Sequence, residues 1–235
     1  MKRLYMLVEG QTEEKFVTDI LGPYLSTKGI VTMKPVITWT SRDTKTGAKC
    51  KGGVKRKDGW DRVRGQLVKL MKENIGPDSL FSTLFDFYGF PQDTPHAVFT
   101  GSHEVDVRAL EDGIFNDVKQ QVNVWPLRFV PVILLHEFET FIFADPQSLD
   151  WEFIEDGDQK KIDQLKKELK QCGSPEAVNN GEETAPSKRI MKQFKSYRKV
   201  NQGNSVVSHI GIEKLLGSCP HFKDRIDALA AMAQQ

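Results

Sequence analysis

The first fourteen residues place a short apolar strand directly before the start of a helix. Leu4 and the apolar run 6–8 predict a buried strand, and Thr12 followed by two glutamates is typical of a capped, acid-rich helix start. A strand that ends at Glu9-Gly10 and turns at once into a helix is a building unit of open α/β folds, and it holds a carboxylate at the carboxyl edge of a sheet. This stretch therefore predicts both a fold class and a place for a site.

Three further apolar segments predict strands that alternate with helices. We expect strands at 30–39 with a break at Pro35, at 79–88 and at 128–136, and helices at about 13–27, 60–74 and 105–122. Gly22-Pro23 is expected to bend the first helix or end it early. The wholly apolar run 130–135 is typical of a central strand in a sheet covered on both faces. This order predicts right-handed crossovers and a largely parallel sheet of about four strands with flanking helices.

The C-terminal part of the chain has a different pattern. An amphipathic segment at 158–171, a helix start at Ser174-Pro175 and closing helices at 210–216 and 222–232 predict a helical region. We therefore expect an α/β domain at residues 1–146 and a helical extension at 147–235, packed on it as one compact unit.

Composition excludes some classes of protein. Lys plus Arg number 33 and Asp plus Glu number 32, so net charge indicates no class of partner. The first apolar stretch is too short for a signal peptide or for a membrane span of roughly 20 residues, and we expect a soluble, cytoplasmic protein. Cys50, Cys172 and Cys219 are far apart and lack CxxC spacing, which favours free thiols over a disulfide framework or a zinc site.

Acidic residues follow three of the four expected strands. Glu9 follows the first strand, Asp86 lies at the end of the third, and Glu137 with Glu139 follow the fourth. Because the carboxyl ends of parallel strands share one edge of a sheet, these groups can converge. Carboxylate oxygens are what Mg²⁺ or Mn²⁺ requires, and such an ion can neutralise a phosphodiester oxygen and lower the pKa of an attacking water. The sequence therefore predicts a metal site of Glu9, Asp86 and Glu137, with Glu139 as ligand or general base.

A structural interpretation of the same residues competes with this one. A single acidic residue at a strand end is more often a helix cap or a solvated turn residue. Asp86 departs from that pattern because aromatic residues surround it, and Glu137 because it follows a long apolar run. His136, beside Glu137, is a candidate ligand or general base, although a lone histidine at a strand end is more often hydrogen-bonded structure.

Several motifs carry a resemblance to a known family. VEGQTEEKFV resembles the first motif of Toprim domains, and FDFYGFP stands in the place of their second acidic motif. The ordered series VEGQTE, DFYGFP, VILLHEFETFIFAD, PEAVNNGEETAPSKRI and CPHF is similar to the Toprim-like domain-of-unknown-function family 4276. The resemblance implies a Toprim-like, Rossmann-like fold and makes Glu9, Asp86, Glu137 and Glu139 candidate metal ligands. Distantly similar nucleases of the OLD type act beside ABC-type ATPases in bacterial anti-phage defence, which implies such a role by analogy.

One position departs from the Toprim pattern. Toprim enzymes usually carry two aspartates one residue apart in the second motif, and Tyr88 stands at the second of these positions. The missing ligand could be replaced by Glu137, Glu139 or Asp145. The alternative is a catalytically silent partner or sensor subunit that docks on an ABC-type ATPase.

Two basic clusters indicate nucleic acid as a partner. Lys55, Arg56 and Lys57 lie in a glycine-rich loop that follows the second strand, and Lys188, Arg189 and Lys192 lie in a basic segment near the C-terminus. In that segment Lys188, Lys192, Lys195 and Lys199 recur at helical spacing near Phe194 and Tyr197, which allows one basic face with a residue for base stacking. A solvated helix face explains the pattern equally well. We predict a Mg²⁺- or Mn²⁺-dependent nuclease.

Overall fold

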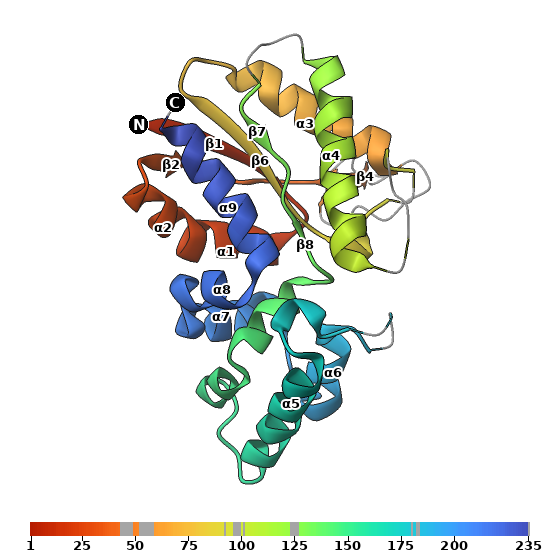
Figure 1. The fold of residues 1–235 in the computed structure, drawn as a ribbon, viewed down its shortest axis with the longest axis vertical. Helices are drawn as coiled ribbons and strands as arrows, with labels where there is room; N and C mark the ends of the chain where they lie inside the picture. Colours follow the sequence, from red (N-terminus) through yellow and green to blue (C-terminus); the bar gives the residue numbers. More distant parts are fainter. Residues whose placement is uncertain are drawn as a thin grey trace.

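The computed structural model describes residues 1–42, 49–51, 59–91, 93–95, 100, 102–122, 127–179, 181 and 184–234. Its centre is a parallel sheet with the strand order β2-β1-β6-β7, in which β3 also pairs with β1 and β8 with β6 (Figure 1). The strands are β1 (Lys2–Val8), β2 (Ile30–Thr32), β3 (Val36–Ile37), β6 (Ser79–Asp86), β7 (Phe129–Val130) and β8 (Ile133–Leu134), with a separate antiparallel pair, β4 (Trp39–Arg42) and β5 (Lys49–Lys51). The predicted α/β fold with a parallel sheet is confirmed.

The helices flank the sheet and build the C-terminal region. They are α1 (Gln11–Phe16), α2 (Gly22–Thr27), α3 (Gly59–Asn74), α4 (His103–Gln121), α5 (Asp158–Cys172), α6 (Pro186–Gln193), α7 (Asn204–Ile210), α8 (Ile212–Ser218) and α9 (Pro220–Ala233). In Figure 1, α5 and α6 lie at the end of the molecule away from the sheet, and α9 returns to it. The expected C-terminal helical region is therefore present.

Two apolar cores form, one on each face of the sheet. On one face, Phe81 and Phe85 of β6 belong to a buried cluster with Leu67 of α3 and Ile114 of α4. On the other face, a second cluster joins β1 and β6 to α1 and α2, and it includes Phe222, Ile226 and Leu229 of α9. Because successive side chains of a strand point to opposite faces, the central strands are buried on both sides. All eight residues of β6 are buried.

Parallel pairing aligns the strand ends where acidic residues occur. Val8 is in register with Leu84, and Asp86 is in register with Leu134. The backbone N–H of Glu9 donates to Leu84 O at 3.1 Å. The residues that follow β1, β6 and β8 therefore meet at one edge of the sheet.

We expected Gly22-Pro23 to bend the first helical segment or to end it early, and in the structure the helical path continues through these two residues. A π-helical turn, Val17–Leu21, connects α1 to α2, and Pro23 lies in the first turn of α2. The wider turn accommodates a proline that cannot donate a backbone hydrogen bond. A Cβ atom on Gly22 would lie 2.8 Å from Val17 O, so this close approach requires glycine.

The apolar run 130–135 is buried but does not form a central strand, so that prediction was wrong. It is divided into β7 and β8, which pair with the outer side of β6 in the described sheet. Pro131, between them, has no N–H to offer to a second neighbour. Helices contribute to the burial of this segment. An apolar run indicates that a segment is buried, but it does not indicate whether strands or helices pack against it.

Among the residues described, Cys172 and Cys219 are free thiols, as expected. The side chain of Cys50 lies outside the described part. No helix in the described ranges is both long enough and apolar enough to span a bilayer.

Candidate functional site

A group of carboxylates surrounds the ammonium of Lys199 at the carboxyl edge of the sheet. Its Nζ lies 2.7 Å from Asp86 Oδ2, 3.5 Å from Glu139 Oε2 and 3.8 Å from Glu13 Oε1. Glu9 completes the group, because its Oε2 accepts a hydrogen bond from the backbone N–H of Asp86 at 3.1 Å. We call these five residues the acidic cluster.

Separate elements deliver these side chains to one place. Glu9 follows β1, Glu13 lies in the first turn of α1, Asp86 ends β6, Glu139 lies in the 3₁₀ turn Phe138–Ala144, and Lys199 begins the π-helical turn Lys199–Gly203. The strand order and register therefore bring together residues that are up to 190 positions apart, since Glu9 and Lys199 are at positions 9 and 199.

The position of Glu9 depends on the backbone that follows β6. Besides the hydrogen bond from Asp86 N–H, the Glu9 carboxylate lies directly over Gly89. A Cβ atom on Gly89 would lie 2.8 Å from Glu9 Oε1 and 3.0 Å from Oε2, closer than side chains tolerate. The glycine of the FDFYG motif is thus what leaves room for the Glu9 carboxylate.

Burial and mutual repulsion keep protons on these carboxylates. Burial, reinforced by the charges of Asp86 and Glu13, raises the pKa of Glu9 to about 8. Burial likewise raises the pKa of Glu13 to about 7, with Asp86 adding to the effect, and raises the pKa of Glu139 to about 7. Burial alone would lower the pKa of Lys199, but its carboxylate neighbours outweigh that and hold it well above its ordinary value. Near neutral pH the cluster therefore contains one firmly charged cation and several carboxyl groups that ionise reluctantly.

The donor set of the acidic cluster suits a hard divalent cation. Glu13 Oε1, Asp86 Oδ1 and Glu139 Oε2 are buried and have no hydrogen-bond partner among the described residues. Oxygen atoms of this kind are the ligands that Mg²⁺ and Mn²⁺ use. Within the described ranges, however, no three His, Cys, Asp or Glu side chains are arranged to hold a metal ion together. Lys199 stands at the centre of the oxygen atoms and supplies the compensating charge.

The sequence-predicted ligands do not all share one environment. Glu9, Asp86 and Glu139 meet in the acidic cluster. The carboxylate of Glu137 accepts a hydrogen bond from the backbone N–H of Ser187 in the first turn of α6, at 3.0 Å. Its negative charge still contributes to the raised pKa of Glu139. Glu137 therefore links the acidic cluster to the basic helix α6.

The basic residues divide into three groups. Lys188 and Lys192 are exposed on α6, whereas Arg189 is paired with Glu168 at 2.8 Å. The side chain of Lys199 belongs to the acidic cluster, so the prediction that it continues a basic helix face was wrong; α6 ends at Gln193. The two aromatic residues suggested for stacking, Phe194 and Tyr197, are buried. Lys55, Arg56 and Lys57 lie outside the described residues.

Sequence reasoning missed Glu13 and Lys199 as site residues. Glu13 was interpreted only as part of an acidic helix start, although it lies four positions after Glu9 across a tight turn. Lys199 carried no local signal, because a lysine near other lysines favours a solvated face. Tyr197 was likewise missed as a neighbour: its hydroxyl donates to Glu139 Oε1 at 3.3 Å. Burial, followed by the charge of Glu139, raises the pKa of Tyr197 well above its ordinary value.

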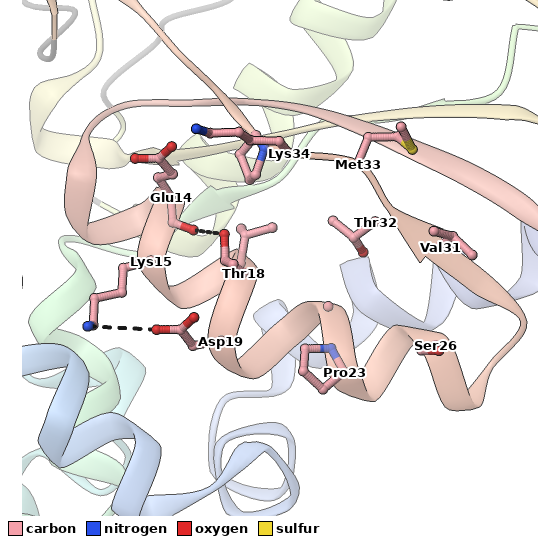
Figure 2. Close-up of a pocket in the computed structure, with 13 residues that line it drawn as sticks. Glu14, Lys15, Thr18, Asp19, Pro23, Ser26, Val31, Thr32, Met33 and Lys34 are labelled. Atoms are coloured by element: carbon pink, nitrogen blue, oxygen red, sulfur yellow. Dashed lines mark hydrogen bonds and ion pairs between the residues drawn. The ribbon is translucent and has the colours of Figure 1, made fainter.

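A separate cavity of about 720 Å³ lies beside α1, α2 and β2 and does not contain the acidic cluster (Figure 2). Glu14 lines it together with Lys15, Asp19 and Met33, and the Lys15 and Asp19 side chains form an ion pair at 3.7 Å. Glu13 belongs to the acidic cluster, whereas its sequence neighbour Glu14 lines this separate cavity. Glu14 is therefore a useful control position for variants of the acidic cluster.

Comparison with known proteins gives one match. The model of a family described as Domain of unknown function (DUF4276) matches residues 8–230, a range that contains the whole acidic cluster. No curated protein and no solved structure matches the chain. The family description assigns no activity, so the chemistry of the cluster is the remaining guide to function.

Proposed function

The chain belongs to the DUF4276 family, and we propose that it is a divalent-metal-dependent phosphodiesterase, a nuclease, that acts on nucleic acid. The observation that carries the proposal is the set of buried carboxylate oxygens without a hydrogen-bond partner on Glu13, Asp86 and Glu139. Mg²⁺ or Mn²⁺ is the cofactor that this donor set fits. Glu9, Asp86 and Glu137 are the proposed core ligands, and Glu137 would have to exchange its hydrogen bond from Ser187 N–H for the ion.

The side chains of the chain have distinct roles in this proposal. When bound, a divalent cation would offset the negative charge of a phosphodiester and lower the pKa of a water molecule. Glu9 is held in place by Asp86 N–H, so it needs little reorganisation to bind a ligand. The pKa of Glu139, raised to about 7, suits a general base that works near neutral pH. Lys199 can pair with a phosphate oxygen once a cation compensates the carboxylates.

Nucleic acid is the proposed substrate because of the basic helix beside the cluster. The hydrogen bond from Ser187 N–H to Glu137 joins the start of α6 to the site, and Lys188 and Lys192 are exposed on that helix. Phosphate contacts of this kind position a substrate without reading its bases, and they weaken with salt. The pairing of Arg189 with Glu168 makes it the weaker contributor on α6. Lys55, Arg56 and Lys57 remain in the proposal on sequence alone.

A second candidate function is a catalytically silent partner or sensor subunit. The observation that favours it is the position of Lys199, whose ammonium already contacts three carboxylates and so replaces a metal ion electrostatically. Tyr88, at the place of an expected aspartate, points the same way. The sequence resemblance to Toprim-like proteins suggests an ABC-type ATPase as the partner and anti-phage defence as the context.

The two candidates differ in their response to divalent cations. Purified protein is incubated with single- and double-stranded DNA and RNA in Mg²⁺, Mn²⁺ or EDTA. The nuclease proposal predicts cleavage that Glu9→Gln and Asp86→Asn abolish and that Glu14→Gln retains, with all variants folded. It also predicts a melting temperature that rises with Mg²⁺ concentration, because a ligand that binds only the folded state stabilises it. Absence of both effects would reject it in favour of the silent subunit.

A further inference from the structure

A second polar cluster lies at the same edge of the sheet and shares no residue with the acidic cluster. His103 is the first residue of α4, His136 follows β8, and Asn179 follows the 3₁₀ turn Pro175–Ala177. The two imidazole Nδ1 atoms are 3.1 Å apart, and Asn179 Nδ2 lies 3.4 Å and 3.3 Å from them. The hydroxyl of Tyr88 lies 3.5 Å from His103 Nδ1, and its ring stacks on His136. We call these four residues the histidine cluster.

The surroundings of His136 direct a lone pair into the histidine cluster. Its Nε2 lies 2.8 Å from the backbone oxygen of Glu176, which can only accept a hydrogen bond. The neutral ring therefore carries its proton on Nε2 and leaves Nδ1 as an electron-pair donor that faces His103. Histidines that bind metals typically donate their other ring N–H to a carbonyl or carboxylate in this way.

The backbone of His136 is strained. Its φ of 73° is the single positive value among the non-glycine residues that the structure describes. A left-handed conformation is unfavourable for such a residue and persists where the surrounding structure enforces it, which is commonest at functional sites. Here the strained turn directs the buried imidazole of His136 toward His103.

The separation of the two imidazoles matches two ligands of one ion. Transition-metal ions bind imidazole nitrogen at about 2.0–2.1 Å, which places neighbouring ligand atoms roughly 3 Å apart. We propose that His103 and His136 bind a transition-metal ion of the Zn²⁺ class through their Nδ1 atoms, with the amide of Asn179 as the third protein ligand. The proposal does not depend on the nuclease function, because the ligands and the class of metal are both different.

The amide of Asn179 and the adjacent cavity both allow such an ion. A half-turn of the amide places its oxygen where Nδ2 now lies, in exchange for the hydrogen bond that Oδ1 accepts from Gly181 N–H. A cavity of about 590 Å³ borders the cluster and provides access for an ion and for water ligands. Its described lining includes Glu104 and Glu176 but neither lysine nor arginine, a charge balance that favours a cation over an anion.

The proposal is tested by Co²⁺ and Zn²⁺ binding to untagged protein with Mg²⁺ in excess. Co²⁺ is titrated with its visible absorption bands as the signal, and bound metal is counted by elemental analysis after dialysis against Zn²⁺. We expect about one ion per chain in the wild type and in Glu9→Gln. His103→Ala, which replaces a partly exposed residue at a helix start, should lose the bands, whereas His209→Ala, at an exposed histidine outside the cluster, should keep them.

A second variant guards against misinterpreting a structural defect. Asn179→Asp adds a charged oxygen and creates a two-histidine, one-carboxylate ligand set, so we expect at least about tenfold tighter Co²⁺ binding. The proposal is overturned if wild type and His103→Ala take up the same amount of metal, or if Asn179→Asp does not tighten binding. In that case the two imidazoles share only a proton.

Discussion

The acidic cluster and the histidine cluster lie at one edge of one sheet, yet they handle charge in opposite ways. The first packs four carboxylates around the single ammonium of Lys199. The second brings together side-chain nitrogen atoms of His103, His136 and Asn179. Carboxylate oxygens suit hard ions such as Mg²⁺, whereas imidazole nitrogen suits Zn²⁺ and its neighbours. If both proposals hold, this edge of the sheet binds two classes of cation and separates them by ligand chemistry.

The difference also determines what each cluster needs in order to fold without metal. Buried carboxylates repel one another, so the acidic cluster requires either an internal cation or bound protons. Lys199 and the raised pKa values of Glu9, Glu13 and Glu139 supply both. The histidine cluster contains no carboxylate, so it needs no internal cation. Its unfavourable feature is the strained backbone of His136.

Removal of Lys199 should have the largest effect on stability. Lys199→Met leaves Glu13, Asp86 and Glu139 without their cation, and loss of one partner of a buried ion pair costs about 3–5 kcal/mol. The lysine side chain is 36% exposed, so solvent screening reduces the expected loss to about 2 kcal/mol. Urea unfolding at pH 8 measures the change.

The matched control for this variant is Lys195→Met, which removes an exposed lysine four positions earlier. Mg²⁺ should restore part of the stability lost in Lys199→Met if the cation takes the place of the ammonium. Equal unfolding free energies for the two variants would show that Lys199 does not compensate the carboxylates.

Glu176→Ala tests the support of the histidine cluster. The Glu176 carboxylate accepts hydrogen bonds from the backbone N–H groups of His221 and Phe222 in the first turn of α9, both at 3.0 Å. Loss of these bonds at a helix N-terminus should cost about 1.5 kcal/mol in unfolding free energy. The backbone oxygen of Glu176 also accepts the hydrogen bond from His136 Nε2. Loss of the carboxylate should loosen the turn that positions this oxygen, so Co²⁺ binding should weaken as well.

The control for that prediction is Glu213→Ala, at an exposed glutamate on α8. Chemical denaturation and Co²⁺ titration are measured on both variants. If Glu176→Ala loses stability but binds Co²⁺ as tightly as the control, the turn that holds His136 does not depend on this cap.

The α/β fold and the convergence of Glu9 and Asp86 could be predicted from the sequence, and the features that could not be predicted have physical reasons. Alternating apolar strands and helices are local patterns, so β1, β6 and the flanking helices could be located, and their shared edge implied that Glu9 and Asp86 meet. Lys199 could not be assigned, because a buried lysine is recognised only through partners that the fold brings to it. Its contacts with Glu13 and Asp86 span more than 100 residues of sequence.

The histidine cluster was equally difficult to predict from the sequence. His136 was noted beside Glu137, but His103 stands at the start of a helix with no pattern around it. Tyr88 was interpreted only as a missing aspartate. In the structure its ring stacks on His136, so this position contributes an aromatic side chain to the histidine cluster.

The pH dependence of Mg²⁺ binding should separate the two clusters further. The pKa values of Glu9, Glu13 and Glu139 lie at about 8, 7 and 7, above the ordinary value of 4.5. Between about pH 4.5 and 8 the unfolded chain releases protons that the folded chain retains, so the metal-free protein loses stability as the pH rises. Mg²⁺ must displace those protons, so its affinity should rise by up to about tenfold, or 1.4 kcal/mol, per pH unit for each proton displaced.

Isothermal titration with Mg²⁺ between pH 6 and about 8.5 measures this dependence. Glu139→Gln removes one titrating group and should flatten the profile, whereas Glu14→Gln should leave it unchanged. A Mg²⁺ affinity independent of pH would mean that the cation binds elsewhere than in the acidic cluster.

The smallest expected effect is that of Tyr197→Phe. The Tyr197 hydroxyl donates to Glu139 Oε1, and a Cβ atom on Gly203 would lie only 2.6 Å from that hydroxyl oxygen. Loss of the donor should cost about 1 kcal/mol in unfolding free energy, since it removes the hydrogen bond to Oε1 of the buried Glu139 side chain. Tyr24→Phe, at a half-buried tyrosine on α2, is the control for thermal unfolding. Because the tyrosine hydroxyl bonds to the acidic cluster and belongs to no part of the histidine cluster, Co²⁺ binding should stay unchanged in Tyr197→Phe while Mg²⁺ binding shifts. An equal change in both affinities would show that the two clusters are coupled.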